Sequence, residues 1–207
     1  WGTGYTDAGA TADGGENVVT SGSVDKDTFG SYTLTYSASD AAGNPAVHVN
    51  RTVTVVDTTA PTISSVTSST ANGSYKEGDS VEITVKFSEA VTLSGGNLVV
   101  TLDTTQTVTI ASISGATSAS GMYTVQSGDT SSDLTVSGIA LSAGSLSDGA
   151  GNAMSSFSIG THLAETSDLI VDTTPPVITL TGGSPFITHD WGTPYSEAGA
   201  TATDAVD

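Results

Sequence analysis

The chain has 207 residues, only 13% of them charged, and its 22 acidic residues against 4 basic ones give a formal net charge of -18. Because phosphate neutralisation needs a basic patch, this balance excludes nucleic acid as a partner. The absence of cysteine excludes disulfides and thiolate metal sites, and without an apolar run of about 18 residues we expect no membrane insertion.

Six segments alternate apolar and polar residues with the period of a β-strand, and clusters of Gly, Asn, Asp and Ser separate them. In chain order they are residues 31–39, 46–56, 80–88, 97–102, 106–113 and 133–141. No segment predicts a helix longer than one or two turns. Short strands at this spacing are typical of a β-sandwich, so we expect an all-β fold.

One local pattern specifies the sandwich type. Asp27, Gly30 and Tyr32 approximate the tyrosine corner of immunoglobulin sandwiches. Leu34 follows on the same strand face, where antibody domains carry a disulfide-bonded cysteine. The predicted fold class is therefore a tandem series of immunoglobulin-like antiparallel β-sandwich domains in an extended array.

Two pairs of repeated sequences mark boundaries between modules. Residues 1–12 (WGTGYTDAGATA) and 191–202 (WGTPYSEAGATA) share nine of twelve residues at an offset of 190. The sequence DTTAP at 57–61 recurs as DTTPP at 172–176, between β-rich segments. Since proline fixes φ and extends the residue before it, both are expected to be stiff linkers.

These boundaries predict three parts. Residues 1–57 form an immunoglobulin-like domain that lacks its first strand. Residues 58–172 form a complete bacterial immunoglobulin-like domain. Residues 173–207 are the N-terminal part of the next immunoglobulin-like copy, so both outer parts are incomplete domains.

Acidic residues gather in the loops that such a fold brings to a linker, because each linker abuts the next domain's B–C and F–G loops. Carboxylate and amide oxygens at this density suit Ca²⁺, which accepts six to eight oxygen ligands. The expected calcium ligands are Asp57, Glu89, Asp148 and Asn152 at the first junction, Asp172, Asp204 and Asp207 at the second, and Asp40 and Asn44 in the first domain. The alternative is that these residues only form solvated Asx-turns.

No residue pattern indicates catalysis, and we predict that the chain is not an enzyme. The three histidines, His48, His162 and His189, lie far apart, and no GxSxG motif is present. Trp191 and Tyr195 occupy the same repeat positions as Trp1 and Tyr5. Such aromatics could form a sugar-binding platform, although packing at a domain edge is the commoner reason for equal placement.

Two sets of stretches carry a family resemblance. Residues 1–57 and 177–207 resemble a bacterial surface-protein immunoglobulin-like domain related to hyalin repeats. The stretches that carry it are SGSVD (21–25), YTLTYSASDAAGN (32–44), RTVTVVD (51–57), ITLTG (178–182) and YSEAGATATD (195–204). The middle part is similar to an immunoglobulin-like repeat of very large adhesins and surface motility proteins, through EGDSVEITVKFSEAV (77–91), SGDTSSDLTV (127–136) and LSDGAGNAM (146–154).

This resemblance implies a secreted, extracellular or cell-surface protein built from repeated spacer domains, with calcium at their junctions and neighbouring repeats as partners. Two other functions stay open. The chain could be a carbohydrate-binding or accessory module of a secreted polysaccharide-degrading enzyme. Alternatively, residues 173–190 could supply the missing first strand to residues 1–57 of another molecule, which would give head-to-tail filaments.

Overall fold

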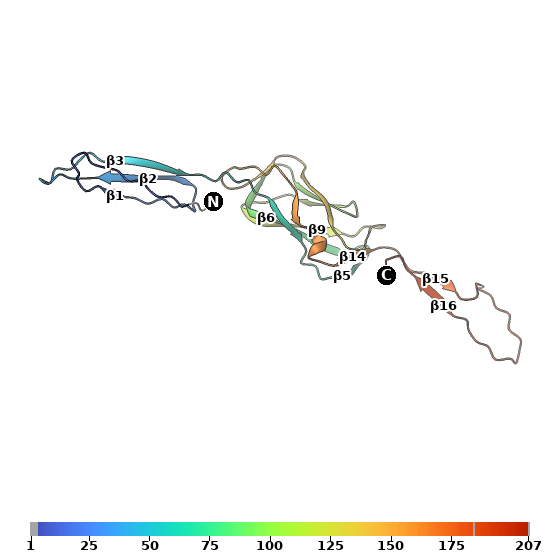
Figure 1. Cartoon of the computed structure of the whole chain (residues 1–207). Coiled ribbons are helices and arrows are strands. Elements are labelled where there is room, and N and C mark those ends of the chain that lie inside the picture. Colours follow the sequence, from blue (N-terminus) through green and yellow to red (C-terminus); the bar gives the residue numbers. More distant parts are fainter. Residues whose placement is uncertain (1–3, 184, 207) are drawn as a thin grey trace.

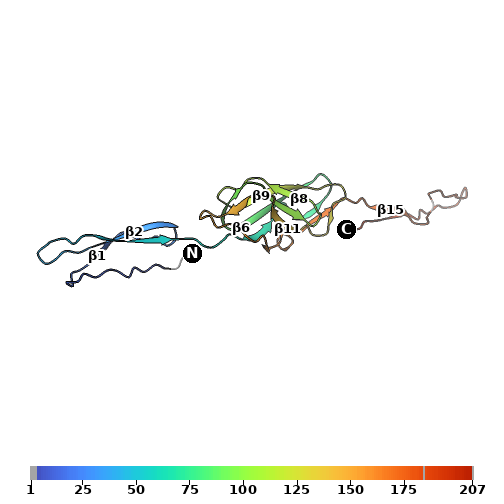
Figure 2. The same ribbon diagram turned by 90° about the horizontal axis from the view of Figure 1, so that it is seen from above.

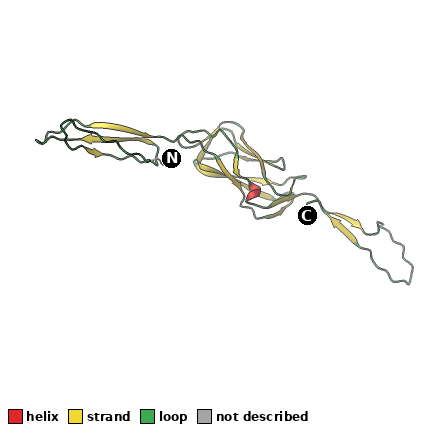
Figure 3. Ribbon diagram, in the orientation of Figure 1, coloured by secondary structure: helices red, strands yellow, loops and turns green. Residues whose placement is uncertain are grey.

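The computed structural model describes residues 4–183 and 185–206. Three groups of strands follow one another in chain order along an elongated molecule (Figures 1 and 2). Nearly all regular structure is strand, and in the described part of the chain the helical structure is one 3-10 turn, η1 (Leu163–Glu165; Figure 3). The prediction of an all-β fold is confirmed. The several antiparallel sheets are consistent with an immunoglobulin-like fold.

The first group is a three-stranded antiparallel sheet in the order β1-β2-β3, which we call the N-terminal sheet. Its strands are β1 (Val19–Ser21), β2 (Gly30–Ser37) and β3 (Val49–Val55). On β2, Leu34 and Tyr36 are buried. The Tyr32 hydroxyl donates to the carbonyl of Thr28 at 2.8 Å, which is the hydrogen bond of a tyrosine corner.

A polar cluster holds the segment before β1 on this sheet. The Tyr36 hydroxyl donates to the Asp7 carboxylate at 2.8 Å, and the Arg51 guanidinium pairs with the same carboxylate. Arg51 also lies over the Tyr36 ring, 5.2 Å from its centre, and donates to the carbonyl of Gly9 at 3.0 Å. These contacts order residues 5–9 without making them a strand.

The second group, which we call the central group, contains the main apolar core. Its strands are β4 (Ile63–Thr67), β5 (Gly73–Tyr75), β6 (Ser80–Ser94), β7 (Leu98–Leu102), β8 (Thr107–Ile110), β9 (Ala116–Thr124), β10 (Thr130–Ser131), β11 (Val136–Leu141), β12 (Ser145–Ser147), β13 (Ile159–Thr161) and β14 (Leu169–Asp172). They form sheets in the orders β12-β6-β4-β13, with β9 also on β6, then β11-β7-β8 and β10-β14-β5. The pairs β13–β4 and β14–β5 are parallel, and the others are antiparallel.

Strand β6 illustrates why this part folds. Val81, Ile83, Val85 and Phe87 fall on alternate positions and are each at most 5% exposed, while the residues between them are more exposed. Because successive side chains of a strand point to opposite faces, this alternation buries one continuous apolar face. All the buried residues of the core cluster lie between Ile63 and Val171.

The third group is a two-stranded antiparallel ribbon, β15 (Val177–Leu180) with β16 (Ala200–Thr203). All eight of its residues are exposed. A two-stranded ribbon without a covered face is marginally stable in water. The ribbon therefore has no apolar core of its own.

All six predicted strand segments contain strands, and β9 is the longest of the strands that lie outside those segments. Its sequence, ATSASGMYT, lacks a run of large apolar residues, yet it pairs with β6 over most of its length. No helix in the described residues is long and apolar enough to span a membrane.

Candidate metal site at the first junction

The loop after β12 folds around the carboxylate of Asp148. Its Oδ1 accepts the backbone amides of Ala150 at 2.9 Å and Asn152 at 2.8 Å, and its Oδ2 accepts the Asn152 side-chain amide at 2.8 Å. Asp148 accepts backbone amides that lie two and four residues further along the chain, so the local sequence determines the shape of this loop. Asp148 is 7% exposed, so these bonds fix a buried carboxylate in one orientation.

Asn152 also reaches out of its loop to the linker. Its Nδ2 donates to the backbone carbonyl of Asp57 at 3.1 Å, across 95 positions of sequence. The Asp57 side chain accepts the amide of Thr59 at 2.9 Å, which shapes the linker between β3 and β4. The linker is therefore attached to the central group just before β4 begins.

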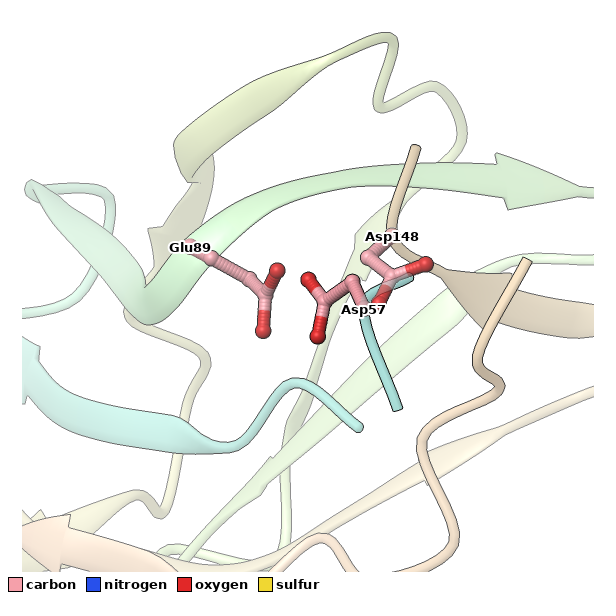
Figure 4. Close-up of side chains that lie close together, drawn as sticks. All are labelled: Asp57, Glu89 and Asp148. Atoms are coloured by element: carbon pink, nitrogen blue, oxygen red, sulfur yellow. The ribbon is translucent and has the colours of Figure 1, made fainter. Parts of the chain in front are cut away.

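Glu89 reaches the same place from β6. The pairing of β6 with β9 shifts register between Lys86 and Val91, so Glu89 lies in an irregular stretch of the strand. Such bulges turn a side chain away from the regular alternation. Figure 4 shows the carboxylates of Glu89 and Asp57 facing each other, with the Asp148 side chain beside Asp57.

One carboxylate oxygen from each of Asp57, Glu89 and Asp148 lies within 4.8 Å of the others. Asp148 is buried and the other two are half-buried. Oxygen donors from a linker, a strand bulge and a loop are the hard ligands that Ca²⁺ takes in irregular geometry. The residues present therefore fit a calcium ion, with the Asn152 side chain beside them.

The pKa values of Glu89 and Asp148 shift in opposite directions. Burial, followed by the negative charges of Asp57 and Asp148, raises the pKa of Glu89 above its ordinary value. For Asp148, burial acts to raise the pKa, but hydrogen bonds from Asn152, Ala150 and Gly151 outweigh it and hold the pKa below the usual range. A neighbouring cation would therefore offset the repulsion that Asp57 and Asp148 exert on Glu89.

The turn before β2 lies beside this loop. A Cβ placed on Gly149 would lie 3.8 Å from Cζ of Phe29, which precedes β2. Lys26 and Asp27 line a small hollow next to Phe29 and Asp57, and the Lys26 ammonium pairs with Asp27 at 2.6 Å. The first junction therefore joins residues of the N-terminal sheet, the linker and the central group.

The expected ligands of the second junction are not gathered in the same way. Asp172 accepts the amide of Thr174 at 2.8 Å, and Asp204 accepts the amide of Val206 at 3.2 Å. Within residues 4–183 and 185–206, the acidic and histidine side chains form no second group of three at metal-binding separation. Asp207 lies outside the described residues.

A hydroxyl anchors the second linker instead, and sequence reasoning missed it. Thr173 Oγ1 donates to the carbonyl of Asp129 at 3.0 Å and accepts the amide of Gly128 at 3.1 Å. The buried Asp129 carboxylate accepts the Tyr123 hydroxyl at 2.7 Å, the Gln126 amide at 2.8 Å and the Gln106 side chain at 2.9 Å. The only sequence signal was an aspartate in the turn SGDT (127–130).

The connection between β2 and β3 repeats the Asp148 loop. Asp40 accepts the backbone amide and the side-chain amide of Asn44, both at 2.8 Å, just as Asp148 does from Asn152. The side-chain bond from Asn44, then the backbone bonds, lower the pKa of Asp40. Unlike Asp148, Asp40 is exposed and lies in no group of three carboxylates within the described part of the chain.

The aromatic positions of the repeat do not form a row in the described residues. Trp191 is fully exposed and Tyr195 is 51% exposed. The His189 and Tyr195 rings meet edge to face, with centres 5.3 Å apart. Tyr5 donates to Asp7 at 3.1 Å, and Trp1 lies outside the described residues.

In a comparison with known proteins, one part of the chain matches a protein family. Residues 1–55 match a family described as a bacterial surface protein, Ig-like domain. This match covers the N-terminal sheet and supports an immunoglobulin-like surface protein, without specifying the repeat types. Neither a curated protein nor a solved structure matches the chain significantly.

Proposed function

We propose that this chain is a spacer segment of a repetitive bacterial surface protein, outside the cell, and that calcium at the first junction stiffens it. The match of residues 1–55 supports the surface-protein part of this proposal. The calcium part rests on one observation, the approach of Asp57, Glu89 and Asp148 within 4.8 Å. The proposed role is mechanical rather than catalytic.

The stiffening follows from where the three ligands come from. Asp57 belongs to the linker, whereas Glu89 and Asp148 belong to the central group. A cation bound to all three would oppose any motion that separates the linker from that group. Without a cation, three carboxylates repel one another at the hinge, which lowers the free energy needed to bend it.

Thermal unfolding tests calcium binding directly. Extracellular modules bind Ca²⁺ with affinities of roughly 0.1–1 mM, so about 5 mM CaCl₂ should nearly saturate the site. For an affinity of about 0.5 mM, ligand linkage gives about 1.4 kcal/mol of stabilisation, or a few degrees in Tm. The measurement compares CaCl₂ with excess EGTA, and MgCl₂ controls for charge screening.

A charge-matched pair of variants locates the effect. Asp148→Asn should abolish the calcium-specific rise, while Glu77→Asn, on the exposed turn before β6, should keep it. Small-angle X-ray scattering of the wild type should show a narrower range of dimensions in calcium than in EGTA. Equal unfolding curves in calcium, magnesium and EGTA would refute the calcium part and leave a spacer without metal.

A further inference from the structure

Two pairs of strands in the central group run parallel, β4 with β13 and β5 with β14. Strands β4 and β5 are the first two of this group in chain order, and β13 and β14 are its last two. In the second pair, Gly73 lies opposite Leu169 and Tyr75 opposite Val171. The parallel pairs therefore join the beginning of the central group to its end.

The two linkers reach these strands from opposite ends of the central group. The first linker, residues 57–61, leads into β4 and then β5, whereas the second, residues 172–176, follows β14. Figure 1 shows the N-terminal sheet and the ribbon β15–β16 beyond the two ends of the group. A pull on these two neighbours therefore draws β5 toward its N-terminal end and β14 toward its C-terminal end.

Parallel pairing determines how such a pull acts on the hydrogen bonds, which are evenly spaced along a parallel ladder. Opposite pulls at the N-terminal end of one strand and the C-terminal end of the other slide the strands along each other. All the bonds between the strands then bear the load together. If both pulls act at the same end of the pair, the bonds break one at a time, so separation needs less force.

Asp168 strengthens the start of the β5–β14 pair through both of its backbone groups. Its carbonyl accepts the amide of Gly73 at 3.0 Å, and its amide donates to Oδ1 of Asn72 at 3.1 Å. The Asn72 side chain thus adds one bond to the ladder beyond the strand itself. On β14, Leu169 and Val171 are fully buried, so sliding this strand would also move two side chains through a closely packed core.

We propose that the parallel pair β5–β14 is the element that resists a pull along this chain, and that β4–β13 is loaded in the same sense. The inference rests on the spacer role proposed above, because a spacer between two attached ends transmits tension. It does not rest on calcium, because Asp57, Glu89 and Asp148 lie outside both β5 and β14.

Pulling the same protein in two directions tests this mechanism. The whole chain is held by handles at its two ends in EGTA, and the unfolding rate is measured at constant force. Unfolding of the central group releases roughly 36–40 nm of chain from its roughly 110 residues, which identifies the event. In the second arrangement, Glu77→Cys on the exposed turn after β5 replaces the N-terminal handle, and the sequence contains no other cysteine.

The second arrangement applies both pulls at the same end of the β5–β14 pair, where Tyr75 lies opposite Val171. We expect unfolding at least about tenfold faster at equal force, because each bond that no longer shares the load lowers the barrier by the net contribution of a hydrogen bond. Equal rates in the two directions would overturn the proposal.

A matched pair of variants locates the resistance. Asn72→Ala removes the bond to the Asp168 amide and should raise the unfolding rate under end-to-end force roughly two- to tenfold. Ser137→Ala removes the hydroxyl bond from β11 to the carbonyl of Leu102. It should lower stability against denaturant to a similar extent but leave the rate under force unchanged. Equal responses of that rate to both variants, or a response to Ser137→Ala alone, would overturn the proposal.

The outcome of these measurements is separate from that of the proposed function. The unfolding rates are measured on the isolated chain, whereas labelling of intact cells shows whether the protein is displayed at the surface. Absence from the surface would refute the spacer role and leave the measured resistance as it stands.

Discussion

The side-chain amide of Asn152 donates to the backbone carbonyl of Asp57 at 3.1 Å and to the carboxylate of Asp148 at 2.8 Å. One amide group thus connects the linker to a loop of the central group. The bond to Asp57 needs no metal, so the junction is partly ordered before any cation binds. Calcium, in our proposal, adds to an attachment that the protein already makes.

Replacing Asn152 separates the attachment that the protein makes without metal from the contribution of calcium. Asn152→Ala removes both side-chain bonds, and we expect a loss of about 1–3 kcal/mol, since each hydrogen bond contributes about 0.5–1.5 kcal/mol. We also expect a wider range of dimensions in scattering. Asn44→Ala is the matched control, because it removes the same bond within an equivalent loop that holds no linker. Equal broadening in both variants would contradict a linker role for Asn152.

Glu89→Gln should change stability in opposite directions with and without calcium. In EGTA the substitution removes repulsion from Asp57 and Asp148, so Tm should rise at neutral pH. In calcium it removes a ligand, so Tm should fall below that of the wild type. Glu77→Gln, on an exposed turn of the same group, should show neither effect. A shift of the same sign in both buffers would argue against metal ligation by Glu89.

The pH dependence in EGTA follows from the raised pKa of Glu89. A group with a raised folded pKa contributes stability that is fully present below its ordinary value of 4.5 and is lost as pH rises through the folded pKa. The advantage of Glu89→Gln over the wild type should therefore grow across that interval and level off above it. Denaturant titrations at several pH values measure this difference, and a difference independent of pH would count against it.

Tyr123→Phe tests the buried pair at the other end of the central group. The variant leaves the Asp129 carboxylate short of one hydrogen bond, and we expect a loss of about 1.5–3 kcal/mol. Burial acts to raise the pKa of Asp129, but bonds from Tyr123, Gln126 and Gln106 hold it below its ordinary value of 3.8. The part of this cost that depends on the negative charge should be complete above pH 3.8 and be lost as pH falls through the folded pKa. Tyr75→Phe, which removes a bond to a neutral carbonyl, should cost less.

Gly144→Ala tests a close backbone approach between the turn that connects β11 to β12 and the end of β6. Gly144 has φ of 75°, and an added Cβ would lie 2.1 Å from the carbonyl oxygen of Ser94. We expect a loss of about 1–3 kcal/mol from the backbone conformation alone, and more from the clash. Gly78→Ala is the control, because its φ is 88° but nothing lies within 4 Å of the added atom. Equal losses in the two variants would show that the clash relaxes without cost.

The amino-acid sequence by itself determined the local structure of this protein. Alternation at Val81, Ile83 and Val85 defines the buried face of β6, and the two DxxGN loops fold alike in different parts of the chain. Both features depend on residues within a few positions of one another. For that reason they could be predicted without knowing the rest of the fold.

We expected Asp57, Glu89 and Asp148 at one junction from the loop order of an immunoglobulin-like fold, but only the tertiary structure decided how distant residues approach one another. The bulge in β6 brings Glu89 to Asp57 and Asp148, whereas the described ligands expected at the second junction form no such group. There, Thr173 and Asp129 attach the linker instead. Such contacts depend on strand register and on loops from separate strands, and neither follows from residue type or local spacing.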